Sequence, residues 1–197
     1  MRTLWLLLSA LVLGGCSTTV VVPPPPPEQP RAVFLLDHGR HASLALETAE
    51  GALVRYSYGE WGWYAERRTG AARAVAALLV ETPAALGRRR LPGPAQEAAL
   101  RRQLRVGIEQ LHRFDAEAEA VDRLQLELDT LFAAAPTAPL YNADFDLEFV
   151  PHPVDYSLRY NSNRAVADWL RQLGCSVSGN PVLSRWHLHP TDKATAE

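Results

Sequence analysis

The fold is decided by residues 33–59, which read VFLLDHGRHASLALETAEGALVRYSYG. Three short runs rich in apolar residues lie within this stretch, and polar turns containing glycine separate them. The runs are Val33–Leu36, Ala42–Glu47 and Leu53–Tyr58. Short apolar or alternating runs with glycine between them are typical of antiparallel strands joined by tight connections. We therefore predict a small antiparallel meander at the start of the folded domain.

The rest of the chain is dominated by helical patterns. Alanine-rich or amphipathic segments predict helices at 71–81, 95–108 and 118–134 and from Asn163 to Gly174. Further strands are expected at 85–91, 156–158 and 182–189, whereas Leu111–Phe114 fits either a strand or the continuation of a helix. The sum is a single α+β domain over residues 33–190, in which a small antiparallel sheet packs against several helices. A polar tail over 191–197 follows it.

The first fifteen residues have the pattern of an export signal. Arg2 supplies a positive charge, and Leu4–Leu13 is an apolar run shorter than the roughly 20 residues that span a bilayer. The run ends in Leu-Gly-Gly-Cys16, which resembles the lipobox of bacterial lipoproteins. Cleavage before Cys16 would let acyl chains anchor the protein in a membrane. Ser17 favours the outer membrane, facing the periplasm, by analogy with known lipoproteins. The alternative is an ordinary secretory signal in which Cys16 has no special function.

Residues 16–32 are expected to form a tether between the lipid and the domain. Pro23–Pro27 is a run of five prolines. Such a run favours the extended polyproline II conformation, at about 3.1 Å per residue. We interpret it as a spacer that holds the domain off the membrane; the alternative is a binding site for a partner that recognises proline.

Charge and cysteine content narrow the classes of protein to which this chain can belong. The chain has a formal net charge of −2 over 197 residues, so it lacks the basic balance that is typical of nucleic-acid-binding proteins. Because Cys16 would carry lipid, Cys175 has no second cysteine with which to form a disulfide. We interpret Cys175 as a small buried residue, with a reactive thiol as the alternative. Nothing in the sequence indicates a cofactor.

Two histidines flank a glycine in Asp37-His38-Gly39-Arg40-His41. Imidazole titrates near neutral pH, so either histidine could act as a general base that faces a cleft. Alternatively, one or both are turn residues bonded to the backbone. A second pair, His187 and His189, is spaced to share one face of a strand. Since no third ligand stands near that pair, we expect no metal site.

Aromatic residues surround a carboxylate just after the third predicted strand. Residues 58–64 read YGEWGWY. Trp61 and Trp63 could form a stacking platform for a sugar or peptide ligand, or they could be core and turn residues. Glu60 is a candidate to orient one of the histidines.

The segment Tyr160-Asn161-Ser162-Asn163 precedes the last predicted helix. Asn and Ser are preferred N-cap residues, so Asn161 or Ser162 could satisfy the first free N–H groups of this helix. Helix N-termini also hold anions and activated nucleophiles, so Ser162 could instead mark a catalytic position, with Asn161 and Asn163 in contact with a ligand.

These motifs together resemble an uncharacterised bacterial family. The patterns His-Gly-x-His-x-Ser-Leu at 38–44, Tyr-Gly-Glu-x-Gly-x-Tyr at 58–64 and Tyr-Asn-x-Asn at 160–163 are similar to the domain of unknown function 2459 family, some members of which are called urease-associated. The resemblance covers roughly 33–179. The last motif of that family usually reads Asn-Cys-Asn. A histidine on a strand followed by a Cys at a later helix start is similar to circularly permuted papain-like enzymes. These include NlpC-type amidases and relatives of lecithin:retinol acyltransferase.

The resemblance implies a role for each matching residue. His41 matches the base, His38 is its turn neighbour, Glu60 matches an acidic position of unclear role, and Ser162 falls where the nucleophilic Cys belongs. A serine hydroxyl is a far weaker acid than a thiol, so it needs a base and an oxyanion hole that a thiolate site does not automatically supply. The resemblance therefore implies a permuted papain-like (NlpC-type) domain with a degenerate site that binds a cell-wall or peptide ligand.

Two alternatives stay open. The first is an active serine variant, an amidase, peptidase or acyltransferase, with Ser162 as nucleophile and His41 as base. The second is a structural lipoprotein whose arginine-rich faces meet another component of the envelope.

Overall fold

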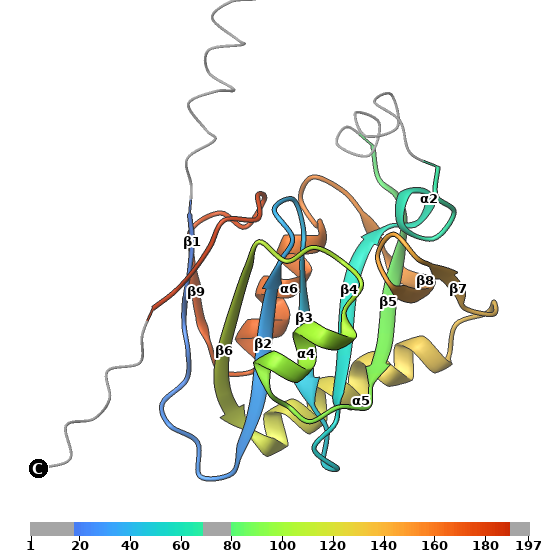
Figure 1. The fold of residues 1–197 in the computed structure, drawn as a ribbon. Helices are drawn as coiled ribbons and strands as arrows, with labels where there is room; N and C mark the ends of the chain where they lie inside the picture. Colours follow the sequence, from blue (N-terminus) through green and yellow to red (C-terminus); the bar gives the residue numbers. More distant parts are fainter. Residues whose placement is uncertain (1–17, 69–79, 190–197) are drawn as a thin grey trace, which may run out of the picture.

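The computed structural model describes residues 18–68 and 80–189. Within them, a seven-stranded sheet runs in the order β6-β2-β3-β4-β5-β8-β7, and every neighbouring pair in it is antiparallel (Figure 1). Its strands are β2 (Pro30–Asp37), β3 (Ala42–Glu47), β4 (Leu53–Glu60), β5 (Thr82–Leu91), β6 (Gln110–Glu117), β7 (Leu140–Asn142) and β8 (Leu147–Tyr156).

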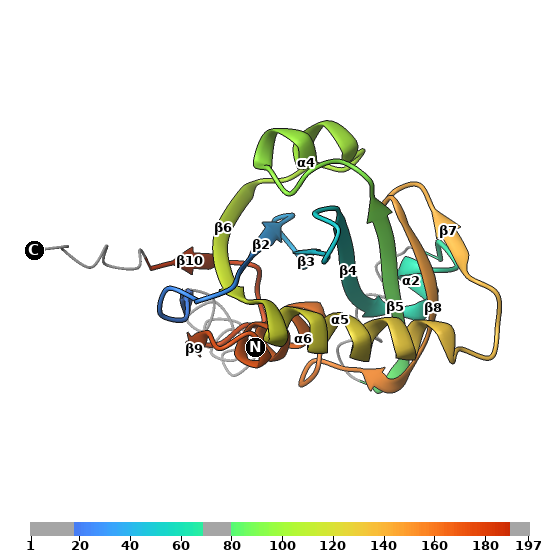
Figure 2. The ribbon, with the colours of Figure 1, turned by 90° about the horizontal axis from the view of Figure 1, so that it is seen from below.

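Helices cover both faces of this sheet, which gives the domain three layers (Figure 2). The helix α4 (Glu97–Gln103) lies on one face, and α5 (Ala118–Ala133) and α6 (Ser162–Gln172) lie on the other. The short helix α2 (Trp61–Tyr64) follows β4 directly. Since successive side chains of a strand point to opposite faces, a sheet covered on both sides requires apolar residues at nearly every position. This explains the continuous apolar runs of β2 and β3.

Each face of the sheet has its own hydrophobic core. The larger core joins Leu44 of β3 to Leu124 of α5 and Leu170 of α6, all fully buried. On the opposite face, Leu100 of α4 packs on a smaller cluster made of Phe34, Leu36, Ala45, Leu53 and Leu91. Burial of a leucine side chain contributes about 1.5–3 kcal/mol, so α6 is held firmly against β3 and β4.

The predicted meander is confirmed. β2, β3 and β4 pair in chain order, with Leu35 opposite Leu44 and Leu44 opposite Tyr56. The sheet is larger than predicted, because the ambiguous Leu111–Phe114 lies within strand β6 and because β5, β7 and β8 also join. The helices α5 and α6 lie where the sequence predicts them, whereas the helix expected at 95–108 is limited to α4. Most of the helix expected at 71–81 lies outside the described residues.

Two prolines make the strand β8 difficult to predict from the sequence. The short strand predicted at 156–158 is wrong, since β8 ends at Tyr156. Pro151 and Pro153 lie inside β8, and proline cannot donate a hydrogen bond to a neighbouring strand. β7 pairs only with Leu147–Phe149, so the half of β8 that contains the prolines forms strand pairs on one side alone within the described residues. A strand can tolerate prolines there because no second neighbour needs the missing N–H.

The segment expected to be a free tether enters the fold. β1 (Thr19–Val22) lies between β9 (Ser176–Ser178) and β10 (Trp186–Leu188) in a second, three-stranded sheet. Val21 is fully buried there. The prediction of a tether over 16–32, with the domain beginning at residue 33, is therefore wrong from Thr19 onward. The β-branched valines of β1 favour a strand, and its partners come from the far end of the chain.

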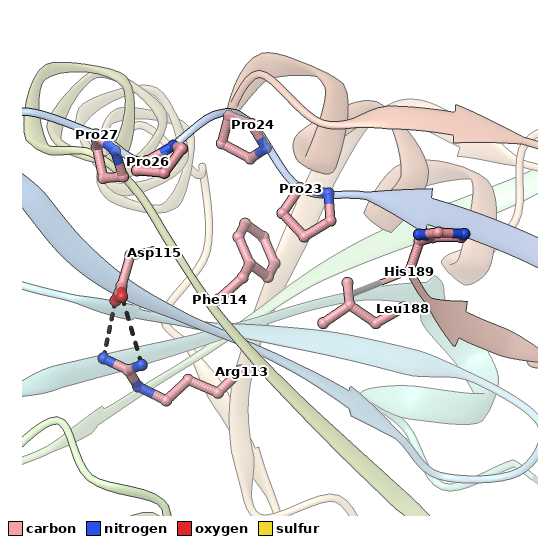
Figure 3. Close-up of a pocket in the computed structure, with 9 residues that line it drawn as sticks. All are labelled: Pro23, Pro24, Pro26, Pro27, Arg113, Phe114, Asp115, Leu188 and His189. Atoms are coloured by element: carbon pink, nitrogen blue, oxygen red, sulfur yellow. Dashed lines mark hydrogen bonds and ion pairs between the residues drawn. The ribbon is translucent and has the colours of Figure 1, made fainter. Parts of the chain in front are cut away.

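The proline run connects β1 to β2. Pro23, Pro24, Pro26 and Pro27 form one side of a cavity of about 340 Å³, opposite Phe114 of β6 (Figure 3). The run is therefore a strap packed along the domain rather than a spacer that points away from it. The signal segment 1–15, Cys16 and the tail 191–197 lie outside the described residues. In the described part of the chain, no helix combines the length and the apolar character needed to cross a bilayer.

Candidate functional site

Three sequence motifs that are far apart in the chain meet at one end of the large sheet. The turn that contains His38 and His41 joins β2 to β3, α2 follows the end of β4, and α6 begins beside them (Figure 1). Asn163 of α6 donates a hydrogen bond from Nδ2 to the carbonyl oxygen of Arg40 at 3.4 Å, which ties the helix start to the histidine turn. The fold thus brings together the residues that the motifs single out.

The helix α6 begins with an asparagine cap. Oδ1 of Asn161 accepts hydrogen bonds from the backbone N–H of Asn163 at 3.1 Å and of Arg164 at 3.0 Å. Ser162 is therefore the first residue of the helix and not its cap. The side-chain Nδ2 atoms of Asn161 and Asn163 both donate to the carbonyl oxygen of Val182. These two asparagines, expected as ligand contacts, anchor the helix start within the fold.

Ser162 is buried and lies beside a tyrosine. It is 3% exposed, and the phenol of Tyr64 is close enough to interact with its hydroxyl. The ring of Tyr64 stands edge-on to the ring of His41, with the ring centroids 5.7 Å apart. Burial raises the pKa of Tyr64 well above its ordinary value, so its phenol stays protonated at neutral pH. Tyr64 thus links Ser162 to His41 by contact, but it does not supply a base.

His41 is a neutral imidazole under ordinary conditions. Burial, followed by the neighbouring His38 and Arg55, lowers its pKa from 6.5 to about 3. Its ring stacks on that of His38, with centroids 4.7 Å apart and planes 21° apart, and it meets the Phe145 ring edge-on. Within residues 18–68 and 80–189, the side chain of His41 makes no hydrogen bond.

His38 is held in one tautomer by three hydrogen bonds. Its Nδ1 lies 2.6 Å from the carbonyl oxygen of Gly107, so Nδ1 carries the proton and donates it. Its Nε2 then accepts from Ser43 Oγ at 2.9 Å and from Arg55 Nη2 at 3.2 Å. Burial and the charge of Arg55 lower the pKa of His38 to about 4. His38 is therefore fixed in the fold and is not available to take a proton from a substrate.

Arg55 lies beneath both histidines and is only 1% exposed. It comes from β4, between the buried residues Val54 and Tyr56. Its Nε donates to Ser43 Oγ at 3.0 Å, its Nη1 to the carbonyl oxygen of Phe145 at 3.0 Å, and its Nη2 to His38. Burial lowers the pKa of Arg55 to about 9, so the guanidinium keeps its charge at neutral pH.

An open cavity of about 340 Å³ has Arg55, His38 and His41 in its wall. We call it the Arg55 cavity. The rest of its wall comes from the loop 106–109 between α4 and β6 and from Asp144 and Phe145 in the turn between β7 and β8. Four segments that are distant in sequence therefore build it. Neither Ser162 nor Tyr64 is part of its wall.

Glu60, Trp61 and Trp63 serve the helix α2. A carboxylate oxygen of Glu60 accepts a hydrogen bond from the Trp63 backbone N–H at 2.6 Å, so Glu60 is the N-cap of that helix. It does not orient His41, which makes no hydrogen bond in the described part of the chain. Trp61 and Trp63 pack against a small cluster that contains Phe149, and they lie outside the wall of the Arg55 cavity.

Three sequence candidates, Cys175, His187 and His189, lie outside the wall of the Arg55 cavity. Cys175 is buried, and burial raises its pKa to about 12, which agrees with the interpretation as a small buried residue. In the described ranges, no three His, Cys, Asp or Glu side chains are grouped closely enough to hold a metal ion. His187 and His189 therefore stay without a third ligand among those residues.

Sequence reasoning missed Arg55, Tyr64 and Phe145. The sequence did contain one signal for Arg55, because this residue stands between apolar and aromatic residues of a predicted strand. A charged residue is rarely buried in such a strand unless it has a partner or a function. No comparable signal marks Phe145. Comparisons of this chain with protein-family models, with curated proteins and with solved structures find no match. The function is therefore inferred from the geometry of the site.

Proposed function

We propose that this protein is a lipid-anchored component of the bacterial envelope, placed in the outer membrane with its domain facing the periplasm. In this proposal the domain has a degenerate, permuted papain-like site and acts as a binding module for a cell-wall or peptide ligand. The N-terminal signal pattern ending at Cys16 supports the anchoring. The support for binding without catalysis comes from the arrangement of Ser162, Tyr64 and His41.

The packing of α6 supports the papain-like topology. This helix contacts β3 and β4, and its first turn lies at the end of the sheet where His41 precedes β3. A histidine at the start of a strand, beside the N-terminus of a helix packed on that strand, is the arrangement that the motif resemblance implies. The order in the chain, histidine first and helix later, is the permuted order.

The observation that carries the proposal is the burial of Ser162, which is 3% exposed and lies beside the phenol of Tyr64. A serine nucleophile needs a neighbouring base to accept its proton during attack. Here its neighbour is a buried phenol with a raised pKa, which remains a protonated hydroxyl at neutral pH. The Ser162 side chain is also almost wholly covered, so a substrate carbonyl has little access to it.

His41 does not compensate for this arrangement. A general base works best when its pKa lies near the working pH, and the pKa of His41 is lowered to about 3. In a Ser-His-Asp site a carboxylate stabilises the protonated imidazole. Here the nearest charge that acts on His41 is the cation Arg55, which opposes protonation. The electrostatics therefore favour a neutral, non-catalytic histidine.

The test is active-site labelling of the full-length protein with a fluorophosphonate probe. We expect no labelling, and no difference between the wild type and Ser162→Ala. Ser57, which is also buried in the fold, supplies the matched control Ser57→Ala. Labelling that is lost in Ser162→Ala and retained in Ser57→Ala would show an active serine enzyme and overturn the proposal.

A second measurement asks whether the position still supports a thiolate. In a Cys16→Ser, Cys175→Ser background, Ser162→Cys would carry the only thiol of the chain. We expect the pKa of this thiol, measured from the pH dependence of its reaction with iodoacetamide, to lie below the ordinary value, because a helix N-terminus favours the thiolate; the absolute rate should be low because the position is buried. A pKa at or above the ordinary value of a free thiol would count against descent from a cysteine site.

A further inference from the structure

We propose that the Arg55 cavity is a binding site for a carboxylate that is accompanied by an ammonium group, as in an amino acid or the end of a short peptide. This inference rests on the proposed binding function and adds the class of ligand. It places the ligand at Arg55, His41 and the loop 106–109, beside Ser162 rather than on it.

Arg55 has no counter-charge bonded to it among the described residues. A buried cation is costly unless an anion or a full set of acceptors compensates it. Arg55 is 1% exposed, and its three hydrogen-bond partners in the described residues are the neutral groups Ser43 Oγ, His38 Nε2 and Phe145 O. The neighbouring Arg89 is paired with Asp146. An anion that enters the cavity would supply the compensation that the fold lacks.

The guanidinium of Arg55 also has N–H donors to spare among the described residues. A guanidinium has five N–H groups, and Arg55 uses one on Nε and one on each Nη atom within the described part of the chain. One N–H group on each Nη atom therefore remains. Guanidinium groups bind carboxylates well because paired N–H donors match the two carboxylate oxygens. The fixed tautomer of His38 holds the guanidinium in place.

His41 offers the ligand a second polar group. Its imidazole is in the cavity wall and makes no hydrogen bond in the described residues. A neutral imidazole has one donor and one acceptor nitrogen. It can therefore donate to a carboxylate or accept from an ammonium group without needing to be charged itself.

The rim of the cavity carries the opposite charge. Glu109 and Asp144 are both exposed, and the nearest cation to Asp144 is Arg67, with Nε 4.0 Å from a carboxylate oxygen. Two carboxylates above a buried cation disfavour a dianion such as phosphate, because like charges repel. They favour a ligand whose carboxylate reaches Arg55 while its ammonium group remains at the rim. The apolar wall beside them, formed by Ile108 and Phe145, suits a small aliphatic side chain.

The experiment is a calorimetric titration of the full-length protein in detergent at pH 7. The probes are D-alanyl-D-alanine and L-alanyl-L-alanine, their N-acetylated and C-amidated forms, and inorganic phosphate. We expect the free dipeptides to bind, the C-amidated forms to bind at least tenfold more weakly, and the N-acetylated forms to bind several-fold more weakly. A preference for the D form would favour a cell-wall peptide, and a preference for the L form an ordinary peptide.

Matched variants identify the site. We expect Arg55→Met to reduce dipeptide affinity at least tenfold. Arg90→Met is the control, since Arg90 lies on the neighbouring strand with its side chain 71% exposed. It removes the same charge away from the cavity, and we expect it to leave the affinity unchanged.

A third variant remains informative if Arg55→Met does not fold. Gly107 lies in the cavity wall, and a Cβ atom there would meet nothing within 4 Å. We therefore expect Gly107→Leu to fold and to lose dipeptide binding because its side chain occupies the cavity mouth.

Several outcomes would overturn the inference. They are no binding by any free dipeptide, equal binding of the amidated forms, tighter binding of phosphate, and undiminished binding by folded Arg55→Met or Gly107→Leu. These outcomes are distinct from failure of the proposed function. Fluorophosphonate labelling at Ser162 would overturn the non-catalytic function, whereas an unlabelled protein that binds no carboxylate would overturn only the ligand class.

Discussion

Arg55 donates a hydrogen bond from Nη2 to Nε2 of His38, across 3.2 Å. This contact makes that nitrogen an acceptor and places a positive charge beside it, so it opposes protonation of His38 and of the stacked His41. The two histidines that the sequence marks as possible bases are thus held neutral by burial, assisted by an arginine that the motifs do not include.

The first prediction is a loss of stability in mild acid. The pKa values of His38 and His41 are about 4 and about 3 in the folded protein, below the ordinary value of 6.5. The unfolded chain therefore binds more protons between about pH 6.5 and about pH 3, and the free energy of unfolding should decrease as the pH falls through that window. Each histidine can contribute a slope of up to about 1.4 kcal/mol per pH unit.

Urea denaturation at pH 7.5, 5.5 and 4.5 measures this slope. We expect a shallower slope for His41→Gln than for the wild type, because one titrating group is removed. His187→Gln is the control, since it removes an exposed imidazole from β10, outside the cavity. Equal slopes for the two variants would contradict the prediction.

The second prediction concerns the contact between Tyr64 and Ser162. Tyr64→Phe keeps the ring packed on Phe145 and Phe149 but removes the hydroxyl that lies beside Ser162. If the two hydroxyls bond to each other, each of Tyr64→Phe and Ser162→Ala should cost about 1–3 kcal/mol, because each leaves a buried partner unsatisfied. The double variant should then cost less than the sum of the two, by about 1 kcal/mol. Additive costs in urea denaturation would show that the two hydroxyls do not stabilise the fold together.

The third prediction tests the cap of α6. Asn161→Ala removes the acceptor for two backbone N–H groups, and we expect a cost of about 1–2 kcal/mol in the free energy of unfolding. Gln96 occupies the same position before α4 but makes no capping hydrogen bond through its side chain, so Gln96→Ala should cost only a few tenths of a kcal/mol. Similar costs for the two variants would argue against Asn161 as the cap.

The fourth prediction concerns a close approach of backbone to ring. A Cβ atom at Gly59 would collide with the ring of Tyr64, whereas one at Gly107 meets open space. A rigid aromatic ring in a packed cluster cannot move aside easily, so we expect Gly59→Ala to cost about 1–3 kcal/mol. Gly107→Ala should be neutral within about 0.5 kcal/mol. Thermal unfolding of the two variants, followed by circular dichroism, makes the comparison.

The fifth prediction concerns the anchor. Replacing Cys16 by serine removes the proposed acceptor for lipid, so we expect Cys16→Ser to move the protein from the membrane fraction to the soluble fraction of the envelope. Cys175→Ser is the matched control and should leave the fractionation unchanged, because Cys175 is buried in the domain. A Cys16→Ser protein that still sediments with membranes would contradict acyl anchoring.

The sequence predicts those parts of the fold whose signals are local. Glycine turns between apolar runs predict β2, β3 and β4, and the polar opening and amphipathic pattern predict α6. The strands β1 and β8 escape such reasoning for a different reason. Pro151 and Pro153 are tolerated because, among the described residues, that half of β8 has a strand partner on one side alone. β1 is a strand only because β9 and β10 return to flank it from the end of the chain.

The candidate site likewise combines motifs that are visible in the sequence with contacts that depend on the fold. The motifs around His41, Glu60 and Ser162 are visible in the sequence, and folding does bring them to one end of the sheet. Their roles depend on neighbours that are distant in sequence. Asn161 and not Ser162 provides the cap, Tyr64 lies beside Ser162, and Glu60 caps α2.

By itself, the sequence determined an α+β domain with an antiparallel meander and a capped helix near its end, and it predicted export. Periodicity and turn chemistry carry this information because they act over a few residues. Only the tertiary structure decided that Arg55 is buried without a carboxylate partner among the described residues, and that it faces a cavity shared with His38 and His41. Burial and charge depend on contacts between β4, two turns and a loop, and these contacts form only when the whole sheet is assembled.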